Sequence, residues 1–128
     1  MKNNVEVIEV KVPMFFHSVL FIIYPDEVDL FATLDQLKLE YEDTQPSVGS
    51  MVYYGERNIC VISLLIDRNN SIGTISHEIL HAVEKILISI GAPTREETEE
   101  IRAHMLQYIL DKALESTAFK EFYQQLLK

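Results

Sequence analysis

Residues 71–91 read SIGTISHEILHAVEKILISIG, and the apolar positions of this segment recur with the spacing of an amphipathic helix. These apolar positions are Ile75, Ile79, Leu80, Val83, Ile86, Leu87 and Ile90. Ser71 or Thr74 can cap the start of the helix, and Gly91, followed by Pro93, ends it. The segment therefore predicts a helix that turns one face toward the core of the protein.

The same helix carries the motif H-E-x-x-H, formed by His77, Glu78 and His81. Side chains four residues apart stand above one another on a helix, so both imidazoles can bind one Zn²⁺, a metal that favours nitrogen ligands. Glu78 then lies beside the metal, where its carboxylate can take a proton from metal-activated water. The two histidines fall at the margin of the apolar stripe, which predicts that they face a cleft. We expect His77 and His81 to be metal ligands and Glu78 to be the catalytic base.

A hydrolytic zinc site has three protein ligands and one open position for water. The next helical segment follows a short loop, so we expect the two helices to be antiparallel neighbours. Glu100 is the best-placed third ligand because it precedes Ile101, on the apolar seam, and shares an i, i+4 face with His104. Glu96 and Glu99 fit the helical phase less well. His104 is an alternative ligand, and it can instead be a catalytic group that contacts the transition state.

The other segments predict an α+β fold. Four stretches read as strands, Val5–Val12, Phe15–Ile23, Met51–Tyr54 and Ile59–Ile66, and three more read as helices, which begin at Pro25, after a capping box of Thr94 and Glu97, and at Thr117. Apolar and polar residues alternate strictly over residues 37–42, so this segment can be extended chain, and the end of the first of these helices stays open. We expect a small sheet packed against the H-E-x-x-H helix and the antiparallel helix that carries Glu100.

Composition and charge limit the classes of function. The chain has 128 residues, of which 48% are hydrophobic and 24% charged, which predicts one globular domain over residues 1–128. The net charge of −9 argues against nucleic acid and anionic membranes as partners, since both are polyanions. The N-terminus lacks the apolar core of a signal peptide, and the longest apolar run, Met14–Tyr24, is too short to span a bilayer. We therefore expect a cytoplasmic protein.

Two residues with reactive side chains fall inside apolar segments. Cys60 is the only cysteine, so no intramolecular disulfide can form, and its apolar neighbours predict a buried small hydrophobe, not a nucleophile. His17 lies within the second expected strand. A lone histidine on an apolar strand is more often a core residue than a ligand, so we expect it to be buried and hydrogen-bonded.

The pentapeptide HEILH, the eighteen residues after it and Glu100 resemble the H-E-x-x-H-x18-E signature of gluzincin zinc metallopeptidases, in particular the aminopeptidase branch. Residues 73–83 also resemble small metallopeptidases of bacteria and their phages. The resemblance covers residues 59–110. One departure is His104, which stands where many gluzincins carry an acidic residue four positions after the ligand glutamate.

This resemblance implies a minimal zincin-like fold in which His77, His81 and Glu100 bind zinc. It also implies that Glu78 is the general base. A strand beside the site, which we assign to Ile59–Ile66, would then bind an extended substrate by β-augmentation.

The sequence thus predicts a zinc-dependent metallopeptidase that hydrolyses peptide bonds and has a peptide or protein as its substrate. His104 or a tyrosine (Tyr53, Tyr54 or Tyr108) can help to stabilise the oxyanion of the transition state. The main alternative is a zincin-like scaffold that binds metal, cleaves nothing and acts as a binding or inhibitory module. A di-iron carboxylate site needs a second E-x-x-H, which the chain lacks, and a structural zinc site usually has a fourth Cys or His.

Overall fold

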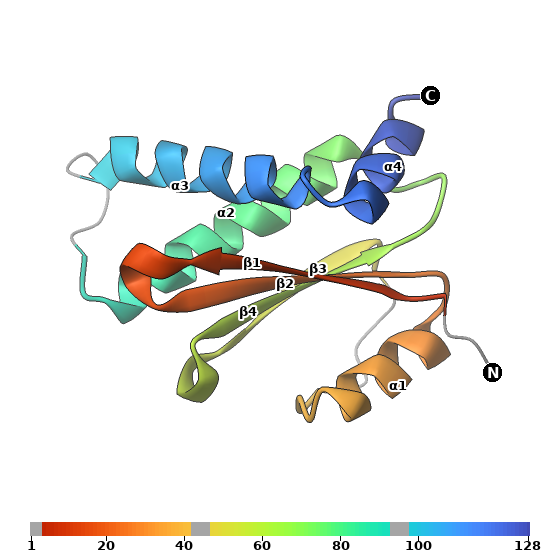
Figure 1. Ribbon diagram of the computed structural model, residues 1–128, viewed down its shortest axis with the longest axis horizontal. Coiled ribbons are helices and arrows are strands. Elements are labelled where there is room, and N and C mark those ends of the chain that lie inside the picture. The colour runs from red at the N-terminus through yellow and green to blue at the C-terminus, as the bar shows by residue number, and fades with distance from the viewer. Residues whose placement is uncertain (1–3, 42–46, 93–97) are drawn as a thin grey trace.

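The computed structural model describes residues 4–41, 47–92 and 98–128 (Figure 1). These residues form an α+β fold, as predicted. The strands are β1 (Glu6–Val12), β2 (His17–Tyr24), β3 (Gly49–Tyr54) and β4 (Ile59–Leu65), and the helices are α1 (Glu27–Gln36), α2 (Ile72–Ser89), α3 (Glu99–Ala113) and α4 (Thr117–Leu126). Short 3-10 turns join β1 to β2 and β3 to β4. In the part of the chain described, no helix is long and apolar enough to cross a membrane.

The four strands form one mixed sheet in the order β1-β2-β4-β3. β1 and β3 run antiparallel to their neighbours, whereas β2 and β4 are parallel and lie at the centre. The central strands are almost continuously apolar because helices cover both of their faces. The prediction that Ile59–Ile66 pairs with a substrate is therefore wrong, since β4 already has a strand on each side. The strand at this edge of the sheet is β3.

The helices lie in two layers, one on each face of the sheet (Figure 1). In one layer α2 packs on β3 and β4 and α3 packs on β1, and α4 lies in the same layer. The core of this side includes Phe21 and Phe119, whose rings meet edge to face with centroids 5.0 Å apart. On the opposite face α1 covers a smaller core that contains Ile22, Leu34 and Val61. Successive residues of a strand point to opposite faces, so the central strands supply both cores.

Local residues set both ends of α2. The Ser71 hydroxyl accepts a hydrogen bond from the backbone nitrogen of Thr74, which makes Ser71 the N-cap. Gly91 follows the helix with a φ of 71°, the left-handed conformation that often ends helices. The capping box predicted at Thr94 and Glu97 lies outside the described residues.

The segment after α1 forms a turn and then runs along the α1 face of the sheet. Lys38 has a φ of 57°, and Leu39 is buried in the core beneath α1. The Arg57 guanidinium donates hydrogen bonds to the carbonyl oxygens of Leu37 and Lys38, at 3.1 Å each. The described part of the alternating segment, residues 37–41, is therefore not a strand. The side chain of Arg57 binds the carbonyl oxygens that a neighbouring strand would otherwise bind.

Candidate functional site

His77 and His81 both lie exposed on α2, away from the side of the helix that is buried against the sheet. Their Nε2 atoms are 3.0 Å apart, a distance at which one neutral ring donates a hydrogen bond to the other, and the angle between their rings is 87°. Two nitrogens bound at about 2.05 Å to one tetrahedral zinc ion are about 3.3 Å apart. The hydrogen-bonded pair is thus within about 0.3 Å of the nitrogen spacing that one zinc ion would need. The sequence predicted that both side chains face a cleft, and in the structure both are exposed to solvent.

Glu78 lies on the side of α2 that faces β3, and only 8% of it is exposed. No described residue donates a hydrogen bond to its carboxylate. Every side-chain oxygen sealed from solvent in the described part has a partner, so the carboxylate oxygens of Glu78 are open to water. A carboxylate that removes a proton from water needs this access.

Gly49, at the start of β3, allows this close approach of α2 to the sheet. A Cβ atom at residue 49 would lie 3.4 Å from Cγ of Glu78 and 2.6 Å from Cγ2 of Thr74. A contact below 3.0 Å requires one of the groups to move, so a side chain at residue 49 would displace the Thr74 side chain or α2 itself. Sequence patterns missed this residue, which fell in an expected loop, because its role depends on a helix distant in the chain. Only a strand boundary placed at Gly49 could have indicated it.

Glu100 and His104 pair with each other on α3. Oε2 of Glu100 is 3.5 Å from Nε2 of His104, and their side chains are 88% and 75% exposed. The described residues contain no group of three or more His, Cys, Asp or Glu side chains that could hold a metal ion. His77, His81 and Glu100 therefore do not form one group in this structure, and neither do the two α2 histidines and His104. The ligand role of Glu100 and the catalytic role of His104 stay predictions.

The packing register of α2 and α3 explains this separation. The two helices run in opposite directions (Figure 1), as predicted, and Nε of Arg102 lies 3.1 Å from Oε1 of Glu84. Glu84 follows His77 by seven residues, which is about 10 Å along the helix axis. Glu100 precedes Arg102 and so lies still further toward the C-terminal end of α2. The spacing of the motif cannot determine this register, because contacts between the helices set it.

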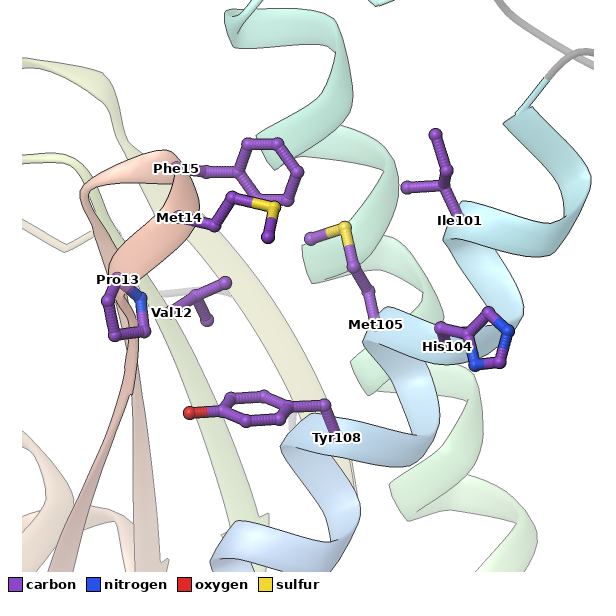
Figure 2. A pocket seen from close by; sticks show the side chains of 8 residues that line it. All are labelled: Val12, Pro13, Met14, Phe15, Ile101, His104, Met105 and Tyr108. Carbon is purple, nitrogen blue, oxygen red and sulfur yellow. The ribbon is translucent and has the colours of Figure 1, made fainter.

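His104 borders a different feature, an apolar hollow of about 490 Å³ between α3 and the turn after β1 (Figure 2). The residues around this hollow are Val12, Pro13, Met14, Phe15, Ile101, His104, Met105 and Tyr108. Tyr108 extends across it toward β1, and its hydroxyl donates a hydrogen bond to the carbonyl oxygen of Lys11 at 3.3 Å. The proton of the Tyr108 hydroxyl is thus donated to the backbone of β1 and not to a substrate.

His17 is buried and hydrogen-bonded, as the sequence predicted, with 6% of it exposed. Its Nδ1 lies 2.6 Å from the carbonyl oxygen of Phe15, which can only accept, so Nδ1 carries a proton. Its Nε2 lies 3.2 Å from the Tyr53 hydroxyl and 3.2 Å from Oγ of Ser89. These contacts join β2, β3 and the C-terminal end of α2, so His17 has a structural role.

Tyr54 and Cys60 both keep their protons at neutral pH. The Tyr54 hydroxyl donates a hydrogen bond to the backbone carbonyl oxygen of Glu40. Burial raises the pKa of Tyr54, and the negative charge of Glu40 raises it further. Cys60 has no exposed surface, and burial raises the pKa of its thiol to about 12. The prediction that Cys60 is a buried hydrophobe is confirmed.

Comparison of the chain with models of known protein families found no match, and comparisons with curated proteins and with solved structures found none either. The resemblance to gluzincins therefore rests on the motif residues alone.

Proposed function

We propose that this protein is a zincin-like, zinc-dependent metallopeptidase of the gluzincin type, in which His77 and His81 hold the metal and Glu78 is the base. The observation that carries the proposal is the 3.0 Å separation of the two Nε2 atoms, which suits one tetrahedral ion. The carboxylate of Glu78 adds to it, because it belongs to the residue next to His77 and is open to water.

Glu78 would act twice in the cleavage of a peptide bond. It takes a proton from the attacking water as the new carbon–oxygen bond forms, and it gives that proton to the leaving amine as the carbon–nitrogen bond breaks. Zinc, when bound, supplies Lewis acidity toward the water and the substrate carbonyl.

An extended peptide has a place to bind along β3. In the described part of the chain β3 pairs only with β4, so its outer edge can accept a further strand. Gly49 brings this strand into contact with Glu78, so a peptide paired with β3 would pass the base. The substrate is therefore proposed to be an unfolded or extended segment of polypeptide.

The proposal needs a third ligand, and Glu100 is the candidate from the sequence. Glu100 lies beyond Arg102 from the histidine pair, so it would reach the pair only if α3 moved along α2. That movement would break the ion pair of Arg102 with Glu84.

The alternative function is a zincin-like module that binds metal and a partner protein without cleaving it. The exposure of both histidines, with no third ligand among the described residues, favours this alternative. It shares the metal site and differs only in the need for Glu78.

The test of the metal site is the zinc content of the chain purified without chelator, measured by mass spectrometry. We expect about one zinc per chain in the wild type, none in His77→Ala, and wild-type content in the control Lys85→Ala, which changes an exposed residue of the same helix. Loss of zinc in Glu100→Ala would make Glu100 the third ligand, and its retention would move that role elsewhere. A wild-type chain that binds no added zinc would overturn the proposal.

A further inference from the structure

A second cavity lies on the α1 face of the sheet, across the sheet from α2. It has a volume of about 650 Å³ and lies between α1, the segment that follows it and the edge of the sheet at β3. Small-molecule sites usually have volumes of about 300–1,000 Å³. The cavity shares no metal-ligand candidate with the site on α2, so the inference below is independent of the proposed function.

The floor of this cavity carries two adjacent hydroxyl groups. Ser50 of β3 pairs with Ser63 of β4, and Val52 pairs with Val61 one step along, so the four side chains share this face. Ser63 is only 6% exposed, and no described residue forms a hydrogen bond with its hydroxyl. Because every sealed side-chain oxygen in the described part has a partner, the Ser63 oxygen opens into the cavity.

This serine marks the cavity as a place for a polar group. A hydroxyl that opens into a cavity can donate one hydrogen bond and accept others, so it can bind water or a polar group of a ligand. The residues on either side of Ser63 in β4 are apolar, so this serine is the one polar side chain of the strand. The hydroxyl is therefore available for a hydrogen bond with a polar group in the cavity.

The walls of the cavity are apolar and partly aromatic. One side of the cavity is lined by Leu30, Phe31 and Leu34 of α1. Tyr41, from the segment that follows α1, also lines the cavity. The rings of Phe31 and Tyr41 stack with centroids 4.8 Å apart and an interplanar angle of 6°. A flat apolar ring can lie between this wall and the valines of the floor.

The charge at the cavity selects among ligands with such a ring. Among the described residues that line the cavity, Glu40 alone is charged, and the guanidinium of Arg57, outside this lining, binds the carbonyl oxygens of Leu37 and Lys38. The Tyr54 hydroxyl donates to the backbone carbonyl of Glu40 and so ties this residue to β3. A carboxylate accepts hydrogen bonds and repels anions, so an amine is favoured over an acid of the same shape.

We propose that this cavity binds a small aromatic amine. The ring of the amine packs between Phe31 and Val61, and its ammonium group pairs with Glu40. A hydrogen bond joins the ligand to the hydroxyl of Ser63. The size, the open serine hydroxyl and the single carboxylate each contribute to this assignment.

The test is a titration of the full chain with tryptamine, followed by NMR spectra of the backbone amides. We expect saturable shifts at Ser50, Val52 and Ser63. Indole-3-acetate has the same ring with the opposite charge, and we expect it to bind at least about tenfold more weakly. The absence of saturable shifts up to about 10 mM tryptamine, shifts centred on α2, or equal affinity for the two probes would each overturn the proposal.

Matched variants measure the separate contributions of Ser63 and Glu40 to tryptamine binding. We expect Ser63→Val to weaken tryptamine about three- to tenfold, whereas the control Ser18→Val, on β2 and outside the cavity, leaves it unchanged. Glu40→Gln should abolish the preference for tryptamine over indole-3-acetate. Glu40 is exposed, so this variant decides the proposal even where Ser63→Val fails to fold. Wild-type behaviour of Glu40→Gln would contradict the inference.

Discussion

Arg102 of α3 and Glu84 of α2 form an ion pair between the two helices, with Nε and Oε1 3.1 Å apart and side chains that are 19% and 39% exposed. A partly buried ion pair is less screened than a surface pair. We expect a double-mutant cycle of Arg102→Ala and Glu84→Ala to give a coupling of about 1 kcal/mol in urea unfolding.

The control for this cycle is the exposed ion pair of Lys112 and Glu115, which are three residues apart in the sequence and have Nζ and Oε2 3.3 Å apart. We expect its coupling to be below about 0.5 kcal/mol. Equal coupling in the two pairs would mean that the Arg102 pair contributes no more than a solvated contact, and the register would then depend on apolar packing.

Gly49 should tolerate no side chain. Gly49→Ala places a methyl group against Cγ2 of Thr74, and rotation of this side chain away from it would disturb the contact of its hydroxyl with Oγ of Ser71. We expect this variant to lower the free energy of unfolding by about 1–3 kcal/mol, measured in urea. Gly73→Ala is the control, because a Cβ at residue 73 would meet only the Ser71 hydroxyl, at 3.5 Å.

Thr74→Ser removes the Cγ2 atom and should restore most of the stability that Gly49→Ala loses. We expect the control Gly73→Ala to be neutral or to stabilise the chain by up to about 1 kcal/mol, since alanine favours a helix more than glycine. A double variant as unstable as Gly49→Ala alone would show that the contact with Thr74 is not the cause.

Cys60 should make the fold sensitive to alkaline pH. Its pKa is about 12 in the folded chain and 9.0 is its ordinary value, so the folded state holds the proton more tightly than the unfolded state. The stability that depends on this proton is complete below pH 9 and is lost as the pH rises from there toward 12. We expect the wild type to lose about 1 kcal/mol more than Cys60→Val between pH 7 and pH 10.

Urea unfolding at the two pH values measures this difference. Tyr24 and Tyr54 also have raised pKa values, mainly because of burial, but both are present in each chain, so their effects cancel in the comparison. Identical losses in wild type and Cys60→Val would show that the thiol does not titrate differently on unfolding.

Glu78→Gln distinguishes the peptidase from the binding module. The substitution removes the base and leaves both histidines in place, so we expect wild-type zinc content. If the chain is a peptidase, cleavage of an unstructured protein such as casein should fall at least about a hundredfold. Full activity of this variant would remove Glu78 from the mechanism.

Local signals in the sequence were enough for most of the elements. The cap at Ser71, the apolar period of α2 and the buried thiol of Cys60 depend on residues close in the chain. Two features of the site depend on distant contacts and could not be predicted this way. The order of strands put β4 at the centre, and the packing of α3 on α2, in which Arg102 pairs with Glu84, set where Glu100 lies beside α2.

The outward direction of His77 and His81 has the same origin. The apolar stripe indicated which side of α2 is buried, but not that β3 and α3 would occupy its two flanks. The histidines are left on the side that none of these elements covers. A helical pattern alone specifies a buried face and does not say what surrounds the rest of the helix.

The two edges of the sheet differ in how well they resist aggregation. β1 carries Glu6, Glu9 and Lys11, and charges of this kind keep an edge strand from pairing with other chains. β3 reads GSMVYY, with neither charge nor proline, and Val52 is 46% exposed. Among the described strands β3 is thus the edge less protected against pairing with another chain, and a lysine at residue 52 should raise the solubility limit.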